Sequence, residues 1–166
     1  MKKIALISDT HYYYGEDIAK YLKDKDEIWH AGDIGDVDTL DKYKSLTTVR
    51  AVYGNIDNAE IRVECPEYLF FTIENLKVLM IHIGGYPSRY SPRAKVLIEK
   101  YKPDIFISGH SHILKIMPDK KNDLLHLNPG ACGLKGFHKV RTLIMFDLDD
   151  KNINNVKVVE MPRYLR

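Results

Sequence analysis

Apolar positions in the first third of the chain alternate between two spacings. Residues 3–8 are almost wholly apolar and too short for a helix, which predicts a buried strand. Ile18, Ala19 and Leu22 then follow at helical spacing within residues 15–25. The succession repeats, with strands predicted at residues 27–30 and 47–52 and a helix at 37–46. Strands alternating with helices predict parallel strands joined by right-handed crossovers.

The pattern changes in the middle of the chain. Residues 67–73 and 77–81 are strand-like and flank a turn sequence, which predicts a hairpin. A helix is predicted at 91–101, with Pro92 in its first turn, and a strand at 104–108. Only strands follow, at 114–118, 124–127, 142–148 and 156–161. Two packed sheets with helices outside explain this order, so we expect a mixed α/β fold in one domain over residues 1–166.

Composition and charge exclude several function classes. Hydrophobic residues are 45% and charged residues 29% of the chain, which is typical of a globular protein. The net charge is +2 and no long basic run is present, so we expect no nucleic-acid partner. Asp9 interrupts the N-terminal apolar stretch, and no segment approaches the ~18 apolar residues of a membrane span. We therefore expect a cytoplasmic protein with no membrane partner.

The two cysteines add little chemistry. Neither Cys65 nor Cys132 has a partner at metal-binding spacing. We expect both to be buried as small apolar side chains in a reducing compartment.

Five of the predicted strands end in residues of the metal-binding types. Ligands in an open α/β sheet bind at the carboxyl ends of the strands, so we expect these side chains to converge on one edge. Within each close pair of candidates, a spacing of two residues puts both side chains on one side of an extended segment. In chain order the candidates are Asp9, His11, Asp33, Asn55, His82, His110 and His112.

The residue types narrow the chemistry of this set. Imidazole and carboxylate ligands without a thiolate suit Mn, Fe, Zn, Ni or Co, and make a poor calcium site. Seven ligands are too many for one tetrahedral ion and enough for two ions that share a carboxylate. Two ions about 3.5–4 Å apart suit in-line displacement at phosphorus. We expect two divalent ions, Mn²⁺ ahead of Ni²⁺, Co²⁺, Fe²⁺ or Zn²⁺, and hydrolysis of a phosphoester by a bridging hydroxide.

The same residues form an ordered set of motifs. D-x-H, G-D, G-N, H and G-H-x-H occur as Asp9/His11, Gly32-Asp33, Gly54-Asn55, His82 and Gly109-His110-Ser111-His112. The chain thus resembles the calcineurin-like metallophosphoesterases, and most of all their small single-domain phosphodiesterases of bacteria and archaea, the YfcE-like group. One motif alone is weakly specific. The complete ordered series, each motif after a strand, spans nearly the whole chain and is specific.

The resemblance implies a fold and a division of the ligands. The family fold is a four-layer α/β/β/α sandwich with two mixed sheets. By similarity, Asp33 bridges the two ions, and Asn55 also contacts the substrate phosphate. The first ion is then held by Asp9, His11, Asp33 and His112, and the second by Asp33, Asn55, His82 and His110. The implied substrate is a small phosphodiester, with phosphomonoesters as the other candidate class.

Two positions depart from the family pattern. Many relatives have a histidine directly after the Gly-Asn motif, where it assists protonation of the leaving group. Ile56 stands there in this chain, and the small phosphodiesterases also lack that histidine, so the general acid is unassigned. The fourth motif is commonly His-Gly, whereas here Ile83 follows His82. A displaced loop at this point would make His82 the least secure ligand.

Several other polar residues could have either a structural or a functional role. We expect His30 to pack in the interior or to orient a ligand, and His126, inside an apolar strand, to be structural. His138 is expected to be exposed on a loop, with a role as the missing acid as the alternative. We expect Arg89 and Arg93 to be solvated rather than to clamp phosphate. Residues 12–14, three tyrosines, either line the substrate mouth or cover their own loop.

Hydrolysis competes with two other functions. The alternative of a different class is a non-catalytic protein-binding scaffold on the same fold, as in some relatives from eukaryotic sorting complexes. Such relatives tend to lose ligands, whereas all seven ligand types are present here. A nuclease is disfavoured by the small size, the near-neutral charge and the lack of a capping domain. The natural substrate and the state of assembly, monomer or homo-oligomer, are left open.

Overall fold

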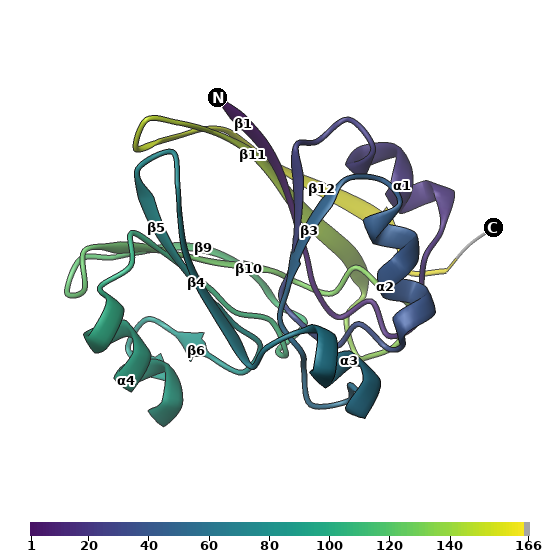
Figure 1. Cartoon of the computed structure of the whole chain (residues 1–166), viewed down its shortest axis with the longest axis horizontal. Helices are drawn as coiled ribbons and strands as arrows, with labels where there is room; N and C mark the ends of the chain where they lie inside the picture. Colours follow the sequence, from purple (N-terminus) through teal and green to yellow (C-terminus); the bar gives the residue numbers. More distant parts are fainter. Residues whose placement is uncertain (165–166) are drawn as a thin grey trace.

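Two mixed β-sheets pack face to face and carry helices on their outer faces (Figure 1). The computed structural model describes residues 1–164. The first sheet has the strand order β12-β11-β1-β2-β3. Three consecutive strands are parallel, namely β1 (Lys2–Ile7), β2 (Glu27–His30) and the edge strand β3 (Thr48–Ala51). Two antiparallel strands complete it, β11 (Val140–Asp149) and β12 (Asn152–Pro162).

The second sheet has the order β4-β5-β8-β10-β9. The hairpin predicted in the middle of the chain is confirmed, and its turn residues Glu74 and Asn75 have positive φ angles of 47° and 60°, as tight hairpin turns require. Its strands are β4 (Tyr68–Ile73), β5 (Leu76–Ile81), β8 (Ile105–Ile107), β10 (Leu124–Pro129) and β9 (Leu114–Asp119). β5, β8 and β10 run parallel, whereas the edge strands β4 and β9 are antiparallel to their neighbours.

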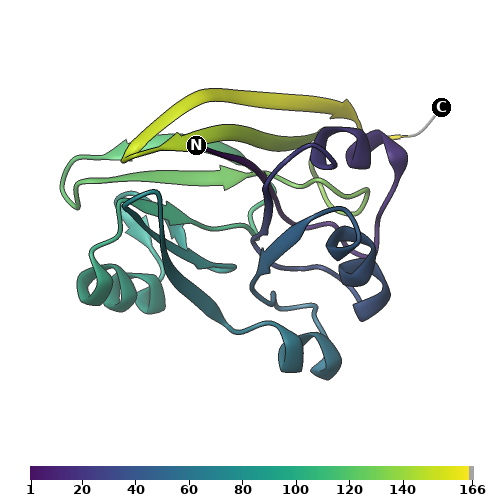
Figure 2. The same ribbon diagram turned by 45° about the horizontal axis from the view of Figure 1, so that its top comes forward.

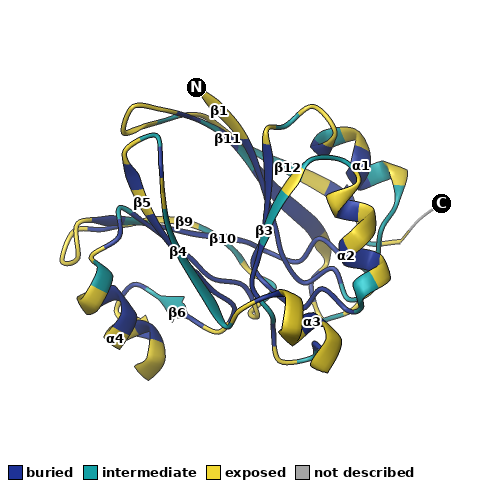
Figure 3. Ribbon diagram, in the orientation of Figure 1, coloured by how far each residue is buried: buried dark blue, intermediate teal, exposed yellow. Residues whose placement is uncertain are grey.

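Alternating side chains on the strands build the layers. In β1, Ile4 and Leu6 enter the core between the sheets, whereas Ala5 and Ile7 pack under the helices α1 (Glu16–Leu22) and α2 (Val37–Lys44). The buried face of α4 (Pro92–Tyr101) covers the second sheet. Figure 2 shows the two sheets with these helices outside them, and Figure 3 shows buried strands between exposed helix faces. The expected α/β/β/α layers are confirmed.

Short elements escaped the sequence pattern. Helix α3 (Ala59–Glu64) has six residues and buries only Ile61, so it shows no periodicity. It begins where the Asn58 side chain accepts a hydrogen bond from the Ile61 N–H at 3.1 Å. The ribbon of β6 (Gly85–Tyr86) and β7 (Arg89–Tyr90) is shorter still. Among the described residues, no helix is long and apolar enough to cross a membrane. The cytoplasmic location and the single-domain organisation remain predictions.

Main-chain hydrogen bonds connect the loops at the carboxyl ends of the parallel strands, both between the two sheets and within the second sheet. The Cys132 N–H, beyond β10, donates to the Ser8 carbonyl beyond β1 at 2.9 Å. The Gly109 N–H, beyond β8, donates to the His82 carbonyl beyond β5 at 2.9 Å. The loops that carry the predicted ligands are therefore tied to one another by backbone as well as by side chains.

His126 is structural, as expected, and makes stability depend on pH. Its ring is fully buried in β10, stacks on Phe106, and has Nδ1 3.1 Å from the Phe106 carbonyl oxygen. Burial lowers the pKa of His126 to about 4. In the unfolded chain the histidine is protonated below about pH 6.5, whereas in the folded protein it stays neutral down to about pH 4. The free energy of unfolding should therefore fall as the pH drops from about 6.5 to about 4.

We predict that H126N reduces this acid sensitivity. An asparagine can still donate to the Phe106 carbonyl but cannot become charged. The wild type should lose up to roughly 3 kcal/mol more than H126N between pH 7 and pH 4.5, measured by urea unfolding. Identical pH profiles for the two proteins would contradict this assignment, whatever the stability of the variant at neutral pH.

Candidate metal centre

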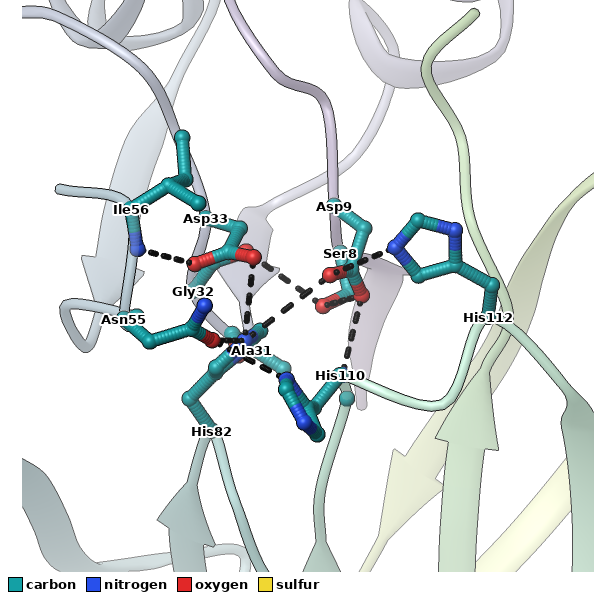
Figure 4. A network of polar contacts seen from close by, with 12 residues as sticks. Ser8, Asp9, Ala31, Gly32, Asp33, Asn55, Ile56, His82, His110 and His112 are labelled. Carbon is teal, nitrogen blue, oxygen red and sulfur yellow. Dashed lines mark hydrogen bonds and ion pairs between the residues drawn. The ribbon is translucent and has the colours of Figure 1, made fainter. Parts of the chain in front are cut away.

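All seven predicted site residues lie together at the carboxyl ends of β1, β2, β3, β5 and β8. Figure 4 labels all of them except His11. The site residues differ in how deeply they are buried. Asp9, Asp33 and His82 are buried, whereas Asn55 and His110 are exposed. The site is therefore anchored in the protein interior and open to solvent on one side.

The first half of the site contains Asp9, His11 and His112. Their ligand atoms all lie within 4.8 Å of one another. The Asp9 Oδ1 atom is 3.2 Å from His112 Nε2 and 3.9 Å from His11 Nε2. The other carboxylate oxygen of Asp9 is occupied, since it accepts from the Ser8 hydroxyl at 2.7 Å and the His110 N–H at 3.1 Å. Oδ1 alone therefore faces the histidines.

The second half contains Asp33, His82 and His110, whose ligand atoms also lie within 4.8 Å of one another. The Asn55 amide oxygen lies between the two histidines, 3.1 Å from His82 Nε2 and 3.0 Å from His110 Nδ1. Asp33 Oδ2 is 3.3 Å from His82 Nε2 and 3.4 Å from His11 Nε2. Asp33 thus faces both halves, as a bridging carboxylate would.

The electrostatics of the site favour positive charge. Burial disfavours a charged imidazole at His82, but Asp33 and Asp9 nevertheless raise the pKa of His82. Burial likewise opposes ionisation of Asp33, yet His11, His82 and the Ile56 N–H hold the pKa of Asp33 far below its usual range. Within residues 1–164, Asp9 Oδ1 and His11 Nε2 have no hydrogen-bond partner. A cation between these atoms would satisfy both, so the donor set fits metal ions.

The backbone of the site is strained. Asp9, His11, Asp33, His110 and His112 have φ angles of 54°, 44°, 57°, 70° and 61°. Side chains other than glycine rarely adopt this left-handed region, and such residues cluster at functional sites. The candidate ligands after β1, β2 and β8 therefore lie in left-handed turns, and the extended geometry expected from the sequence is wrong for them.

His82 lies inside the site despite the altered fourth motif. Its Nδ1 is 2.7 Å from the Ala31 carbonyl oxygen, which fixes that nitrogen as the N–H donor. The opposite nitrogen, Nε2, then faces Asp33. The residues after His82 do not displace the loop, because the His82 carbonyl also accepts from the Gly109 N–H.

A buried carboxylate that we did not single out holds the loops in place. Asp57 accepts from the N–H groups of Ile34, Gly35 and Gly54 at 3.2, 2.8 and 2.8 Å. It thereby ties the loop of Asp33 to the loop of Asn55. Its position two residues after Asn55 is the sequence signal that could have identified it.

His30 is a packed histidine, and it supports the same region. Its Nδ1 accepts from the Gly32 N–H at 3.1 Å, and its Nε2 lies 2.9 Å from the Thr10 hydroxyl. Burial lowers the pKa of His30 to about 4, so the ring is neutral near pH 7. It connects the loops of Asp9 and Asp33 without reaching the ligand atoms.

The expectation for His138 is wrong. We expected an exposed side chain, but only 9% of His138 is exposed, and its Nδ1 lies 3.2 Å from Nδ1 of His112. Its Nε2 lies 2.9 Å from the Gly133 carbonyl oxygen. Both ring nitrogens are engaged, so His138 is also no free proton donor for a leaving group. No sequence periodicity marks this contact, because residues 131–139 form no regular element.

The remaining side chains divide between surface and core. Arg93 forms a two-point ion pair with the Glu67 carboxylate on the surface, and Arg89 is exposed. Within residues 1–164, neither side chain forms a hydrogen bond with a candidate ligand. Tyr12 is 52% exposed beside His11, whereas Tyr13 and Tyr14 pack against the core under α1. Cys65 and Cys132 are buried and unpaired, as expected.

We predict that D57N destabilises the metal-free protein. Both carboxylate oxygens of Asp57 accept hydrogen bonds from loop N–H groups. An asparagine would replace one of these oxygens with an NH₂ donor, which would leave at least one buried N–H group without an acceptor. The cost should be about 1–3 kcal/mol, measured by urea unfolding. The exposed variant D41N, on α2, serves as the control and should change stability by less than about 0.5 kcal/mol. Equal stabilities of the two variants would show that the loops do not depend on Asp57.

Solved structures share the fold with this chain. An archaeal phosphodiesterase matches with a TM-score of 0.74 and 20% identity, covering 96% of this chain and 99% of that one. Wild-type Vps29 of Entamoeba histolytica, solved in complex with Zn²⁺, matches with a TM-score of 0.73 and 18% identity, covering 98% and 99%. At these identities the likeness concerns the fold.

Comparison of amino-acid sequences identifies relatives of higher identity and the family of the chain. A probable metallophosphoesterase of Methanothermobacter thermautotrophicus is 33% identical over 133 residues, which are 77% of this chain and 76% of the relative. Another probable metallophosphoesterase, from Methanocaldococcus jannaschii, is 34% identical over 148 residues, 82% and 74% of the two chains. The family model of the calcineurin-like phosphoesterase superfamily domain matches residues 1–151. With this match over the residues that build the site, the chain belongs to the calcineurin-like phosphoesterase superfamily.

Proposed function

We propose that the chain hydrolyses small phosphodiesters with two divalent transition-metal ions, Mn²⁺ foremost. The observation that supports the proposal is the pair of ligand clusters facing a single carboxylate, with Asp33 Oδ2 3.3 Å from His82 Nε2 and 3.4 Å from His11 Nε2. Membership of a phosphoesterase superfamily agrees with this chemistry. Phosphomonoesters are the second substrate class.

The proposed ligand division follows the two clusters. Asp9, His11 and His112 would hold the first ion, and His82, His110 and Asn55 the second, with Asp33 shared. When bound, such a pair of ions supplies Lewis-acid stabilisation of phosphoryl oxygens and activates water near neutral pH. The protein contributes fixed positions, because Asp9 and His82 each have their second polar atom bound to backbone groups.

Asn55 has a further role toward the substrate. Its amide oxygen faces His82 and His110 (Figure 4), and its amide nitrogen has no hydrogen-bond acceptor among residues 1–164. An exposed N–H₂ group there can donate to a phosphoryl oxygen and hold the substrate beside the ions. Asn55 would thus serve both an ion and the phosphate.

The site offers no free general acid among the described residues that contact the ligands. Ile56 occupies the position where many relatives have a histidine, His138 has both nitrogens engaged, and Asp57 is saturated by backbone donors. The leaving group must then depart with little protonation. Its intrinsic stability as an anion should control the rate.

We predict strong dependence on the leaving group. With Mn²⁺ present, kcat/KM for aryl methyl phosphates should fall steeply as the pKa of the phenol rises, and dialkyl phosphodiesters should be hydrolysed far more slowly than any aryl diester. The measurement is a linear free-energy plot over five or six phenols. Dialkyl esters cleaved as fast as aryl esters would require an acid in the site and would refute this account.

We also predict that Asp33 is essential for metal binding and turnover. Mn²⁺ at a hundredfold excess over its Kd should raise the Tm of the wild type by about 5–10 °C. D33N should lose most of that shift and reduce kcat/KM by at least about a hundredfold, because loss of a supporting residue alone costs 10–100-fold. The surface variant D41N should behave as the wild type. A full Tm shift in D33N would exclude Asp33 as the bridge.

A binding function is the second candidate, and the rim of the site favours it. Tyr12, Ile83 and Ile113 each directly follow a candidate ligand, and their exposed fractions are 52%, 45% and 58%. Exposed apolar residues grouped in this way are common at protein interfaces. Some structural neighbours are Vps29 proteins, named for vacuolar protein sorting.

Metal content and turnover separate the two candidates. A scaffold would purify without metal and remain inert when Mn²⁺, Ni²⁺ or Co²⁺ is added, whereas the enzyme should bind and turn over aryl diesters. The presence of the complete ligand set favours the enzyme.

A further inference from the structure

The loop between β10 and β11 reaches the site through one buried histidine. His138 lies in this loop and its side chain contacts His112. The two Nδ1 atoms are 3.2 Å apart, the ring centroids are 5.1 Å apart, and the ring planes are inclined at 69°. His112 is a candidate ligand of the first ion, whereas His138 belongs to no family motif found in the sequence. The contact therefore brings a residue from outside the motif set against the ligand set.

Hydrogen-bond chemistry decides which ring carries the proton between them. The Gly133 carbonyl oxygen can only accept, so His138 Nε2, 2.9 Å away, must carry a hydrogen. A neutral imidazole has only one N–H, which leaves His138 Nδ1 as an acceptor. The buried ring of His138 has no carboxylate among its hydrogen-bond partners that would hold it charged. The hydrogen in the contact then belongs to Nδ1 of His112.

The consequence falls on the other nitrogen of His112. With its hydrogen on Nδ1, His112 presents a lone pair at Nε2, which is 3.2 Å from Asp9 Oδ1. That oxygen has no hydrogen-bond partner among residues 1–164. Two acceptors that face each other in this way repel, and a cation between them removes the conflict.

We propose that His138 is a positioning residue that fixes His112 in the tautomer able to bind the first metal ion. The proposal rests on the metal site of the proposed function. It adds the chain of hydrogen bonds from the Gly133 carbonyl through His138 to His112. His138 touches neither ion nor substrate and acts through the ring that it orients.

The loop is built to allow this contact. Gly136 has φ +133°, and a Cβ atom there would lie within contact distance of both Nδ1 atoms, 2.9 Å from that of His138 and closer still to that of His112. Any side chain at this position would therefore push the rings apart. From beyond β12, the Arg163 guanidinium donates to the carbonyls of Leu134 and His138 at 3.3 and 3.1 Å, which holds the loop.

The first test reads the tautomer directly and needs no variant. Long-range ¹H–¹⁵N spectra of the metal-free wild type near pH 8 distinguish protonated from unprotonated ring nitrogens. We expect His112 to carry its hydrogen on Nδ1 and His138 on Nε2. A hydrogen on Nε2 of His112 would overturn the proposal and would leave the proposed hydrolysis untouched.

The second test compares two substitutions of His138. In H138N, the amide oxygen lies about where Nδ1 was and can still accept from His112, whereas H138L has no acceptor. Chelator competition with Mn²⁺ should show the first-ion affinity of H138L reduced about 10–100-fold, with the second ion little changed. H138N should retain wild-type affinity within a few fold.

The controls separate positioning from general damage to the loop. F137A removes the neighbouring side chain, which is fully exposed, and should leave both metal affinities unchanged. Circular dichroism checks that each variant is folded. Equal losses of affinity in H138N and H138L would show that His138 only fills space, and would overturn the proposal. Failure of the proposed function would appear differently, as wild-type protein that binds metal but does not hydrolyse diesters.

Discussion

The structure depends on one electrostatic constraint at the junction of its two sheets. The carboxylates of Asp9 and Asp33 are buried where imidazole nitrogens from three loops converge. Asp9 Oδ1 lies 3.2 Å from an imidazole nitrogen and has no hydrogen-bond partner among residues 1–164. A buried negative charge is stable only beside positive charge or donors. The raised pKa of His82 shows how strongly the two carboxylates draw positive charge into this position.

Carboxylate oxygens and unprotonated imidazole nitrogens that face one another at short distance repel, so other parts of the fold must keep them in place. The strained turns at the strand ends carry positive φ angles that few side chains adopt. Asp57 binds three loop N–H groups, His30 bridges two of the ligand loops, and His138 contacts His112 from a further loop. None of these contacts belongs to the motif set. The candidate ligands all lie in the motifs, whereas the residues that support them lie outside the motifs.

The two candidate functions draw on different parts of the same surface. The buried half, with both carboxylates, suits phosphoryl chemistry, and the exposed apolar side chains that follow the ligands suit contact with a bulky group. A phosphodiester with an apolar substituent would use both. A scaffold would use only the rim and would not need the strained, unpaired interior, which is why the buried polar geometry favours catalysis.

Patterns in the amino-acid sequence were enough to predict the strand-rich α/β order, the hairpin at residues 74–76 and the identity of all seven residues that meet at the site. These follow from local rules, because strand periodicity and strand-end position are properties of short segments. The short helix α3, the backbone strain of the candidate ligands and the buried position of His138 could not be predicted in this way. Those features depend on contacts between distant loops, such as His112 with His138 across 26 residues, and no local spacing encodes such a contact.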